Sequence, residues 1–508
     1  MDIRSVIEKY GGKLNPRIMG AVLKLARSIP PVKKRVEAEY EEIMRDLEDV
    51  VKPYRSRSAT FSEIPKTGLD RDAILKEMEE LRSTEESKWK DGFVSGAVYH
   101  GDEDHINFLN RVYAINSQSN PLHSDIWPSA FKYESEIVSM TAKMLGANGI
   151  GHGAESESEI CGVVTSGGTE SILLAMKTYR DWARDKKGIT KPEVVVPSTA
   201  HAAFDKAGEY FKIKIVHVAV GPDYRADEVE IRKAMSRNTI AIVGSAPSFP
   251  HGVIDPIQEL SELARERGVG FHTDACLGGF VLPWAERLGY DIPPFDFKLP
   301  GVSSISADTH KYGYAGKGSS VILYRGLELR HYQYFKATEW PGGLYFSPTF
   351  AGSRPGALSA LCWAALVATG EKGYLEATEK ILKASEKIRK GIQEIPELHI
   401  LGNPLWVIAF GSKTLDIYRI MDYMTKNRWS LNGLHKPPSV HICVTLRHTL
   451  PGVPERFLSD LRSAVEYVRE NPHEKGKMAP VYGLAANIPD RSIVAELLEK
   501  YIDLLYRI

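Results

Sequence analysis

The chain of 508 residues is predicted to be an α/β protein with a mainly parallel sheet covered by helices on both faces. From about residue 134 to residue 306, short apolar runs alternate with helical patterns, which is typical of parallel strands joined by helical crossovers. Polar side chains and glycines follow several of these runs, where α/β proteins bind ligands. Beyond residues 355–395, the pattern of short apolar runs and helical segments changes, which indicates a smaller α+β unit.

The expected elements of the large unit follow in chain order. Its strands are the apolar runs EVVVP (193–197), IKIVHVAV (213–220), TIAIVGSA (239–246), VGFHTDA (269–275) and VSSIS (302–306). Its helices are 134–145, 169–188, 201–211, 226–235 and 256–268, and Gly188 is a plausible C-terminal stop for the second.

The rest of the chain is divided by its patterning. Residues 32–51 have apolar residues at helical spacing among charges of both signs, which predicts an arm packed on a neighbour, with a membrane-surface helix as the alternative. The small unit is expected to have strands at 398–402, 405–412 and 439–446, and helices at 415–424, 454–470 and 490–506. We therefore expect three parts: 1–57, a helical arm; 58–370, the large domain; and 371–508, the small C-terminal domain.

Composition excludes several classes of protein. Lys plus Arg and Asp plus Glu both number 65, and this balance argues against a dedicated nucleic-acid binder. The four cysteines are scattered without a CxxC pair, which argues against a disulfide framework or zinc cluster and fits a reducing compartment. No apolar run approaches the roughly 20 residues of a membrane span, and the N-terminus has no signal-peptide segment. We expect a soluble, cytoplasmic protein.

Three polar motifs coincide with strand ends and helix starts. TSGGTES (165–171) leads into a helix, whose first backbone N–H groups and dipole would attract an anion. It matches neither the Walker pattern nor G-x-G-x-x-G, and taken alone it is equally well a capped helix. HTDACLGG places Asp274 at the end of a strand, and SADTHKYGYAGKGSS places Lys311 after another. His272 and Asp274 have no third ligand at a recognisable spacing, so we expect no metal.

An anion cup, an aspartate and a strand-end lysine together suit pyridoxal 5'-phosphate. Lys311 would form the Schiff base, Asp274 would keep the pyridine nitrogen protonated, and the cup would bind the phosphate. His201, in the motif PSTAHAAFDKA, is a candidate to stack on the ring, although a lone histidine is more often a packed or surface residue.

These motifs, with AGSRPG (351–356), resemble the fold-type-I pyridoxal-phosphate enzymes of the group II decarboxylase family. APSFPHGVIDPI, DTHKYGYAGKGSS, TFAGSRPG and VYGLAA are similar to the sphingosine-1-phosphate lyases within that group. The resemblance covers most of the chain from about residue 30. It implies a seven-stranded, mainly parallel sheet domain, a smaller C-terminal α+β domain and a homodimer. Eukaryotic relatives carry an N-terminal membrane span that is not seen here, which implies a bacterial-type soluble form.

The resemblance also implies roles for individual residues. Lys311 is similar to the Schiff-base lysine, Asp274 to the pyridinium partner and His201 to the stacking histidine. Expected contacts of the cofactor phosphate are Gly168, Thr169, His310 and, from the partner subunit, Ser353. Expected substrate-binding residues are Tyr99, Asn120, His123, Lys317 and Tyr482, the last of which would close the site. Phe249 occupies a position where a tyrosine would offer a hydroxyl. Phenylalanine cannot transfer a proton, so if the reaction requires proton transfer at this position, another residue must perform it.

The implied reaction is cleavage of the C2–C3 bond of a phosphorylated sphingoid base to a long-chain aldehyde and phosphoethanolamine. Lys317, six residues after the anchor, would bind the substrate phosphate, which a decarboxylase of this fold does not need. The proton acceptor for the C3 hydroxyl is open among Lys311, His201 and the substrate phosphate. The rival enzyme is an amino-acid α-decarboxylase. The rival from another class is a silent cofactor-binding or membrane-docking protein, against which intact Lys311 and Asp274 argue.

Overall fold

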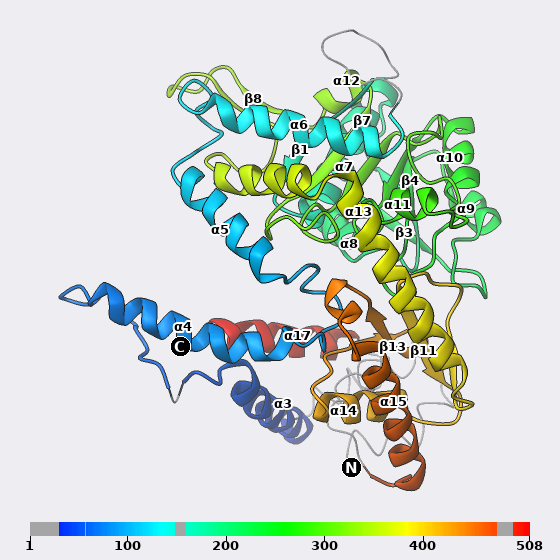
Figure 1. The fold of residues 1–508 in the computed structure, drawn as a ribbon. Coiled ribbons are helices and arrows are strands. Elements are labelled where there is room, and N and C mark those ends of the chain that lie inside the picture. The colour runs from blue at the N-terminus through cyan, green and yellow to red at the C-terminus, as the bar shows by residue number, and fades with distance from the viewer. Residues whose placement is uncertain (1–29, 56, 148–158, 475–490) are drawn as a thin grey trace. The chain divides into compact units, whose positions relative to one another are not determined.

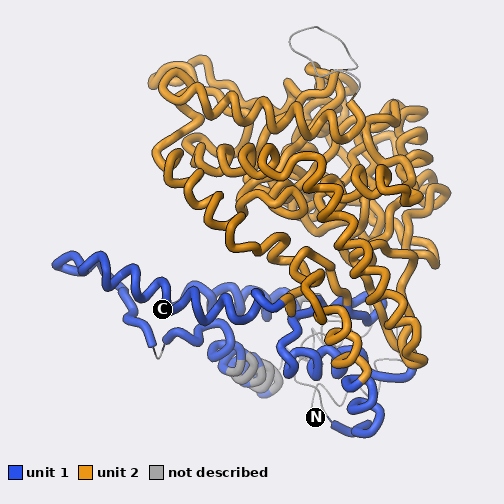
Figure 2. The backbone as a smooth tube through the Cα atoms, in the orientation of Figure 1, with its two compact units in different colours: residues 1–91, 414–440, 463–508 blue, residues 92–413, 441–462 orange. Residues whose placement is uncertain are grey.

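The computed structural model describes residues 30–55, 57–147, 159–474 and 491–508 (Figure 1). Its contacts divide the chain into two compact units, residues 1–91, 414–440 and 463–508, and residues 92–413 and 441–462 (Figure 2). The predicted boundaries after residues 57 and 370 divide the chain differently and stay a prediction.

A seven-stranded sheet lies at the centre of the second unit. Its order is β1-β7-β6-β5-β4-β2-β3. The bounds are β1 Ile160–Thr165, β2 Glu193–Pro197, β3 Lys214–Val218, β4 Thr239–Ser245, β5 Gly270–Asp274, β6 Ser304–Ala307 and β7 Ser320–Arg325. Only β7 runs antiparallel to its neighbours, which confirms the mainly parallel sheet.

Five of these strands match the expected runs, whereas β1 and β7 were not among them. β7 follows β6 after a loop instead of a helical crossover, so the alternation of strands and helices gives no signal for it.

Helices cover this sheet. Those between its strands are α7 Gly168–Lys187, α8 Ala203–Phe211, α9 Glu228–Ala234, α10 Ile257–Glu266 and α11 Leu282–Arg287. Those before and after it are α5 Glu103–Asn116, α6 Pro128–Met144, α12 Leu327–His331 and α13 Gly356–Gln393, with the short hairpin β8 Phe335–Ala337 and β9 Tyr345–Ser347. Gly188 ends α7 in a left-handed conformation with φ of 64°, as expected for a C-terminal stop.

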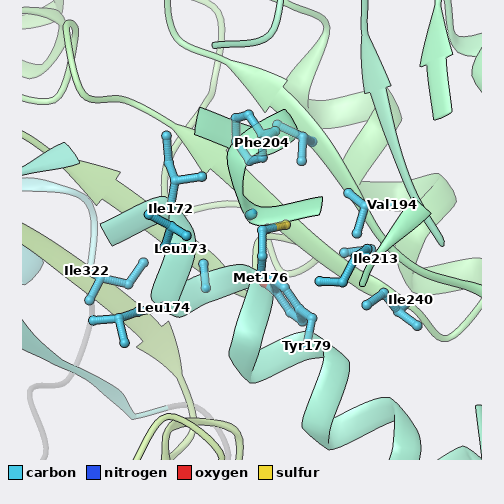
Figure 3. Packing of buried hydrophobic residues seen from close by; sticks show 14 of the residues in the cluster. Ile172, Leu173, Leu174, Met176, Tyr179, Val194, Phe204, Ile213, Ile240 and Ile322 are labelled. Atoms are coloured by element: carbon cyan, nitrogen blue, oxygen red, sulfur yellow. The ribbon is translucent and has the colours of Figure 1, made fainter. Parts of the chain in front are cut away.

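The buried face of α7 forms much of the core. Ile172, Met176 and Tyr179, three or four residues apart, belong to a cluster that includes Val194 of β2 and Ile240 of β4 (Figure 3). Complete burial of such a side chain contributes roughly 1.5–3 kcal/mol. The packing therefore fixes where α7 begins, and with it the position of the TSGGTES motif.

The smaller sheet has the order β10-β11-β13-β12. Its strands are β10 Leu398–Ile400, β11 Val407–Ser412, β12 Asn432–His435 and β13 Pro438–Cys443, and η1 Leu446–Thr449 and α15 Val453–Glu470 follow. α13 is interrupted at Gly370, whose φ of 59° and ψ of 175° are not helical. This smaller C-terminal sheet completes the expected fold class.

The remaining helices are α3 Pro30–Val51, α4 Arg71–Trp89, α14 Ile417–Lys426 and α17 Arg491–Tyr506. Within the expected arm, residues 30–51 are helical as α3, which contacts α17; residues 1–29 lie outside the described residues. No helix in the described residues is long and apolar enough to cross a membrane.

Gly270 tests the packing between α7 and β5. A Cβ atom at this position would lie 2.2 Å from Cε1 of Tyr179, whose hydroxyl is held by hydrogen bonds. We expect Gly270→Ala to destabilise the protein by roughly 1–3 kcal/mol through overpacking, measured as a lower melting temperature. Gly68→Ala is the control, because nothing lies within 4 Å of a Cβ there. Equal melting temperatures of the two variants would contradict the packing described here.

Candidate active site

The ends of β4, β5 and β6 lie side by side. In the strand register, Asp274 pairs with Ser245 on one side and Ser306 on the other. The Asp274 carboxylate is 7% exposed and accepts hydrogen bonds from the Cys276 backbone N–H (3.1 Å) and the Ser306 hydroxyl (3.4 Å). The aspartate predicted at a strand end is therefore at the carboxyl edge of the sheet, oriented by two donors.

The N-terminus of α7 lies beside this edge. Its N-cap, Gly167, makes no side-chain hydrogen bond, so the cap leaves the first N–H groups of the helix, those of Gly168 and Thr169 among them, without a side-chain acceptor. A Cβ at Gly168 would lie 2.7 Å from both Asp308 Oδ1 and Cys276 Sγ, so only glycine fits there. His310 is adjacent, with its Cε1 atom 3.8 Å from a Cβ placed at Gly167.

Lys311, which is half-buried, forms an ion pair with the buried Asp308, three residues earlier. Lys311 Nζ lies 2.8 Å from Asp308 Oδ2, and the Asp308 side chain is 3% exposed. Burial alone would lower the pKa of Lys311, but the Asp308 carboxylate outweighs it and raises this pKa above its ordinary value. Burial likewise opposes the charge of Asp308, but Lys311 and His310 outweigh it and lower the pKa of Asp308.

Asp308 was not among the predicted site residues. The signal was its spacing, three residues before Lys311, which suits an ion pair. Its other oxygen, Oδ1, is buried and has no hydrogen-bond partner among the described residues. Cys276 lies among the same charges, and they affect its thiol. Burial raises the pKa of this thiol most, Asp274 and Asp308 raise it further, and Lys311 lowers it.

A second cation lies near this ion pair. Lys317 Nζ is 4.5 Å from the centre of the Tyr99 ring and 3.5 Å from the carbonyl oxygen of His310. Surrounding atoms desolvate the amine and Lys311 repels it, which lowers the pKa of Lys317 to about 8. Tyr99 in turn packs edge-on against Tyr312, with ring centres 4.9 Å apart. No acidic group among the described residues forms an ion pair with Lys317, so an anion could approach it.

His201, Phe249 and His441 form a row of aromatic rings. The ring centres are 6.4 Å apart between His201 and Phe249, and 4.8 Å apart between Phe249 and His441. His201 Nδ1 accepts a hydrogen bond from the Ala203 backbone N–H at 3.1 Å, which fixes the orientation of the exposed imidazole. Burial lowers the pKa of His441 to about 4. No contact in the described part of the chain joins His201 to Lys311.

Two other predicted residues meet each other but not Lys311. Asn120 Nδ2 donates a hydrogen bond to Ser353 Oγ at 3.2 Å, and the Arg354 backbone N–H donates to Asn120 Oδ1 at 3.3 Å. His123 lies three residues after Asn120 and packs against Trp127. Within the described residues, no hydrogen bond or ion pair connects this group to Lys311 or Lys317. Tyr482 lies outside the described residues.

These groups fit pyridoxal phosphate. Lys311 supplies a half-buried amine, and Asp274 supplies a carboxylate at the carboxyl edge of the sheet. The start of α7 and His310 supply an anion cup. The close approach of Asp308 Oδ1 and Cys276 Sγ to Gly168 gives the cup a fixed shape. Sheet, cup and lysine together define a fold-type-I pyridoxal-phosphate enzyme.

Two further features of the described residues concern other kinds of site. No group of three or more potential metal ligands occurs in the described part of the chain. A cavity of about 650 Å³ lies at the opposite edge of the sheet from Lys311, lined by residues that include Tyr179, Arg265, Ser303 and Arg325. It holds none of the predicted site residues.

Comparisons with known proteins agree with this class. The pyridoxal-dependent decarboxylase conserved domain matches residues 53–410. A sphingosine-1-phosphate lyase of Arabidopsis thaliana is 47% identical, over 96% of this chain and 89% of its own length. The solved structure of a Burkholderia pseudomallei sphingosine-1-phosphate lyase is 41% identical with a TM-score of 0.81, covering 88% of this chain and 99% of that one. Glutamate decarboxylase of Lactobacillus brevis, 19% identical with a TM-score of 0.69 over 82% of this chain and 98% of its own, shows the fold alone.

The chain belongs to the pyridoxal-dependent decarboxylase family, and within it to the sphingosine-1-phosphate lyases. It is therefore a pyridoxal-phosphate-dependent carbon–carbon lyase of fold type I, as the sequence motifs implied.

The surroundings of Lys317 lead to a prediction about its titration. Because desolvation and the nearby Lys311 both disfavour the charged amine, we expect Lys317 to be protonated below about pH 8 and neutral above it. Lys311→Ala should raise this midpoint, because a like charge is removed, and Asp308→Asn should lower it, because an opposite charge is lost. NMR of ¹³C-methylated lysines in the cofactor-free protein measures both shifts. An unchanged midpoint in both variants would place Lys317 outside the field of the ion pair.

Proposed function

We propose that this enzyme cleaves the C2–C3 bond of phosphorylated sphingoid bases, such as sphingosine 1-phosphate, to a long-chain aldehyde and phosphoethanolamine. The observation that carries the proposal is the second cation, Lys317, which lies within the field of Lys311 and has no acidic ion-pair partner among the described residues. An ammonium group facing the ring of Tyr99 suits a substrate phosphate, which an amino-acid decarboxylase does not have to bind.

The cofactor is assigned to the residues that fit it. Lys311 would be its covalent anchor, Asp274 would contact the ring nitrogen, and His201 would stack on the ring. Gly168, Thr169 and His310 would bind its phosphate at the start of α7. When bound, pyridoxal phosphate supplies an electron sink for the bond that breaks.

The residues of the chain would handle the proton of the substrate's C3 hydroxyl. The candidates for the proton acceptor are Lys311, His201 and the substrate phosphate. The ion pair between Lys311 and Asp308 favours Lys311. Because Asp308 raises the pKa of Lys311, the freed amine would be a strong base beside the reacting carbons. Phe249 has no hydroxyl to share this task, so its ring can only pack beside His201.

Tyr99, Asn120, His123 and Lys317 would bind the substrate phosphate, and Tyr482 would close the site. Asn120 and Ser353 bond to each other but not to the Lys311 group. We therefore propose a homodimer in which the partner subunit supplies Ser353, and with it Asn120 and His123. Four free, buried cysteines support a reducing location, which we propose to be the cytoplasm.

The reaction products separate this function from its rival. Incubation of the purified enzyme with sphingosine 1-phosphate should release a long-chain aldehyde and phosphoethanolamine, detected by mass spectrometry. Release of carbon dioxide from an amino acid, without aldehyde formation, would establish the decarboxylase instead.

Lys311 is tested by chemical trapping. We expect the holoenzyme to be yellow and borohydride to fix the cofactor on the peptide that contains Lys311, because this amine lies beside the anion cup. Peptide mapping by mass spectrometry identifies the labelled residue, and Lys311→Ala is the control that should remain unlabelled. Label on a different lysine in the wild-type protein would contradict the assignment.

Lys317 is tested by substrate discrimination. A charge-assisted contact is worth roughly 1.5–3 kcal/mol, so Lys317→Met should lower kcat/KM for sphingosine 1-phosphate about tenfold to a hundredfold. The variant should lose much of the preference over unphosphorylated sphingosine, whereas Lys317→Arg keeps the charge and should keep most of it. Full preference in Lys317→Met would mean that this lysine does not bind the phosphate.

The shared site is tested with hybrid dimers. One chain carries Lys311→Ala and the other Ser353→Trp, and each alone should be inactive. A hybrid dimer combines Lys311 of one chain with Ser353 of the other at one of its two sites, so random exchange should restore about a quarter of wild-type activity. Activity is assayed after subunit exchange has been verified by native mass spectrometry. No recovery in such a mixture would argue for sites built from one chain.

A further inference from the structure

A line of buried polar side chains leads away from Asp274 across the sheet. Ser306 Oγ lies 3.4 Å from Asp274 Oδ1 and 3.2 Å from His272 Nε2. His272 Nδ1 lies 2.8 Å from Ser304 Oγ, which lies 2.5 Å from the hydroxyl of Tyr179. The register of β5 and β6 produces this line, because His272 pairs with Ser304 and Asp274 pairs with Ser306. Residues two apart on a strand share a face, so all four side chains meet.

The hydrogen bonds of this line can be ordered in one direction. Burial lowers the pKa of His272 to about 4, so the ring is neutral and carries a single N–H. Ser306 donates its proton to the Asp274 carboxylate, which leaves its oxygen as an acceptor. The N–H of His272 is therefore on Nε2, donating to Ser306, and Nδ1 accepts from the Ser304 hydroxyl.

Tyr179 lies at the far end of the line. Its hydroxyl donates to the Phe271 carbonyl oxygen at 3.0 Å and lies 2.8 and 2.5 Å from the hydroxyls of Ser303 and Ser304. From Ser304 through His272 and Ser306, each hydrogen bond then points toward Asp274, and aligned hydrogen bonds of this kind reinforce one another.

Packing alone does not account for a histidine at this place. His272, Ser304 and Ser306 each have 0% exposed surface, and burying their polar atoms costs free energy that an apolar side chain would not. His272 also contacts the ring of Phe204, so a leucine could fill the space. The polar atoms are retained in an arrangement in which each has a partner and the last donor faces Asp274.

We propose that His272 is a positioning residue that acts through Ser306 to hold the Asp274 carboxylate in the orientation that binds the cofactor's ring nitrogen. This inference rests on the role of Asp274 under the proposed function. His272 would touch neither cofactor nor substrate. Together with the Cys276 thiol, which also donates to Ser306 Oγ at 3.3 Å, it would fix the rotation of the Ser306 hydroxyl that faces the carboxylate.

The test compares His272→Leu, which removes the donor, with His272→Gln, whose amide N–H can still reach Ser306. The readouts are the dissociation constant of pyridoxal phosphate from the cofactor-free protein and the pH midpoint of the visible absorption band of the holoenzyme. We expect His272→Leu to weaken cofactor binding about fivefold, the size of one ordinary hydrogen bond. Its band midpoint should move in the same direction as in Asp274→Asn but by less, and His272→Gln should restore most of both values.

A double-mutant cycle tests whether His272 acts on Asp274 through Ser306. Because His272 acts through Ser306, His272→Leu should add nothing to the effect of Ser306→Ala on the dissociation constant. His448→Leu is the matched control, a fully buried histidine bonded to Thr445 and not to this line. It should lower the melting temperature and leave both cofactor readouts unchanged.

The outcomes separate this inference from the proposed function. If His272→Leu lowers only the melting temperature while Asp274→Asn alters the cofactor readouts, the positioning role is wrong and the function stands. If Asp274→Asn alters neither readout, the role of Asp274 is wrong, and the inference falls with it. Should His272→Leu fail to fold, Ser306→Ala decides: unchanged cofactor readouts in that variant overturn the proposal.

Discussion

A buried carboxylate requires a compensating charge, and in this protein the ammonium group of the half-buried Lys311 provides it 2.8 Å from Asp308 Oδ2. Much of the local structure follows from this pair. The carboxylate lies so close to the start of α7 that residue 168 must be glycine, and that glycine lets the helix bring its first N–H groups beside the two charges. The start of α7 and the Lys311 amine are thus held together by the Asp308–Lys311 ion pair and by the space that the Asp308 carboxylate occupies.

The pair also shapes the electrostatics of the second cation. Lys317 is repelled by Lys311 and partly desolvated, so its charge is held less firmly than that of an ordinary lysine. An arriving phosphate would restore the favourable charge balance, which couples substrate binding to protonation of Lys317. The two lysines of this loop therefore differ: Lys311 is paired with Asp308, whereas Lys317 has no acidic ion-pair partner among the described residues.

The fold and the motif positions were largely readable from the sequence, because short apolar runs and helical periodicity reflect local burial. Five of the six parallel strands, and the helices α7 to α10, were found in this way. β1, β7 and the short helix α11 were not, and β7 gave no signal because it joins the sheet through a loop. Asp308 was passed over because its importance depends on burial. The row from His201 through Phe249 to His441 unites residues distant in the chain, which no spacing rule connects.

The sequence by itself determined the class of chemistry: a lysine after a strand, an aspartate ending another and a glycine-rich helix start are local patterns, and local patterns are written in consecutive residues. Only the tertiary structure decided which groups act on one another. The pairing of β5 with β6 places Ser306 beside both Asp274 and His272, and the fold buries Asp308 against Lys311 while it leaves Asn120 with Ser353. Burial and strand register arise from contacts between distant segments, so these interactions, and the charges they stabilise, exist only in the folded chain.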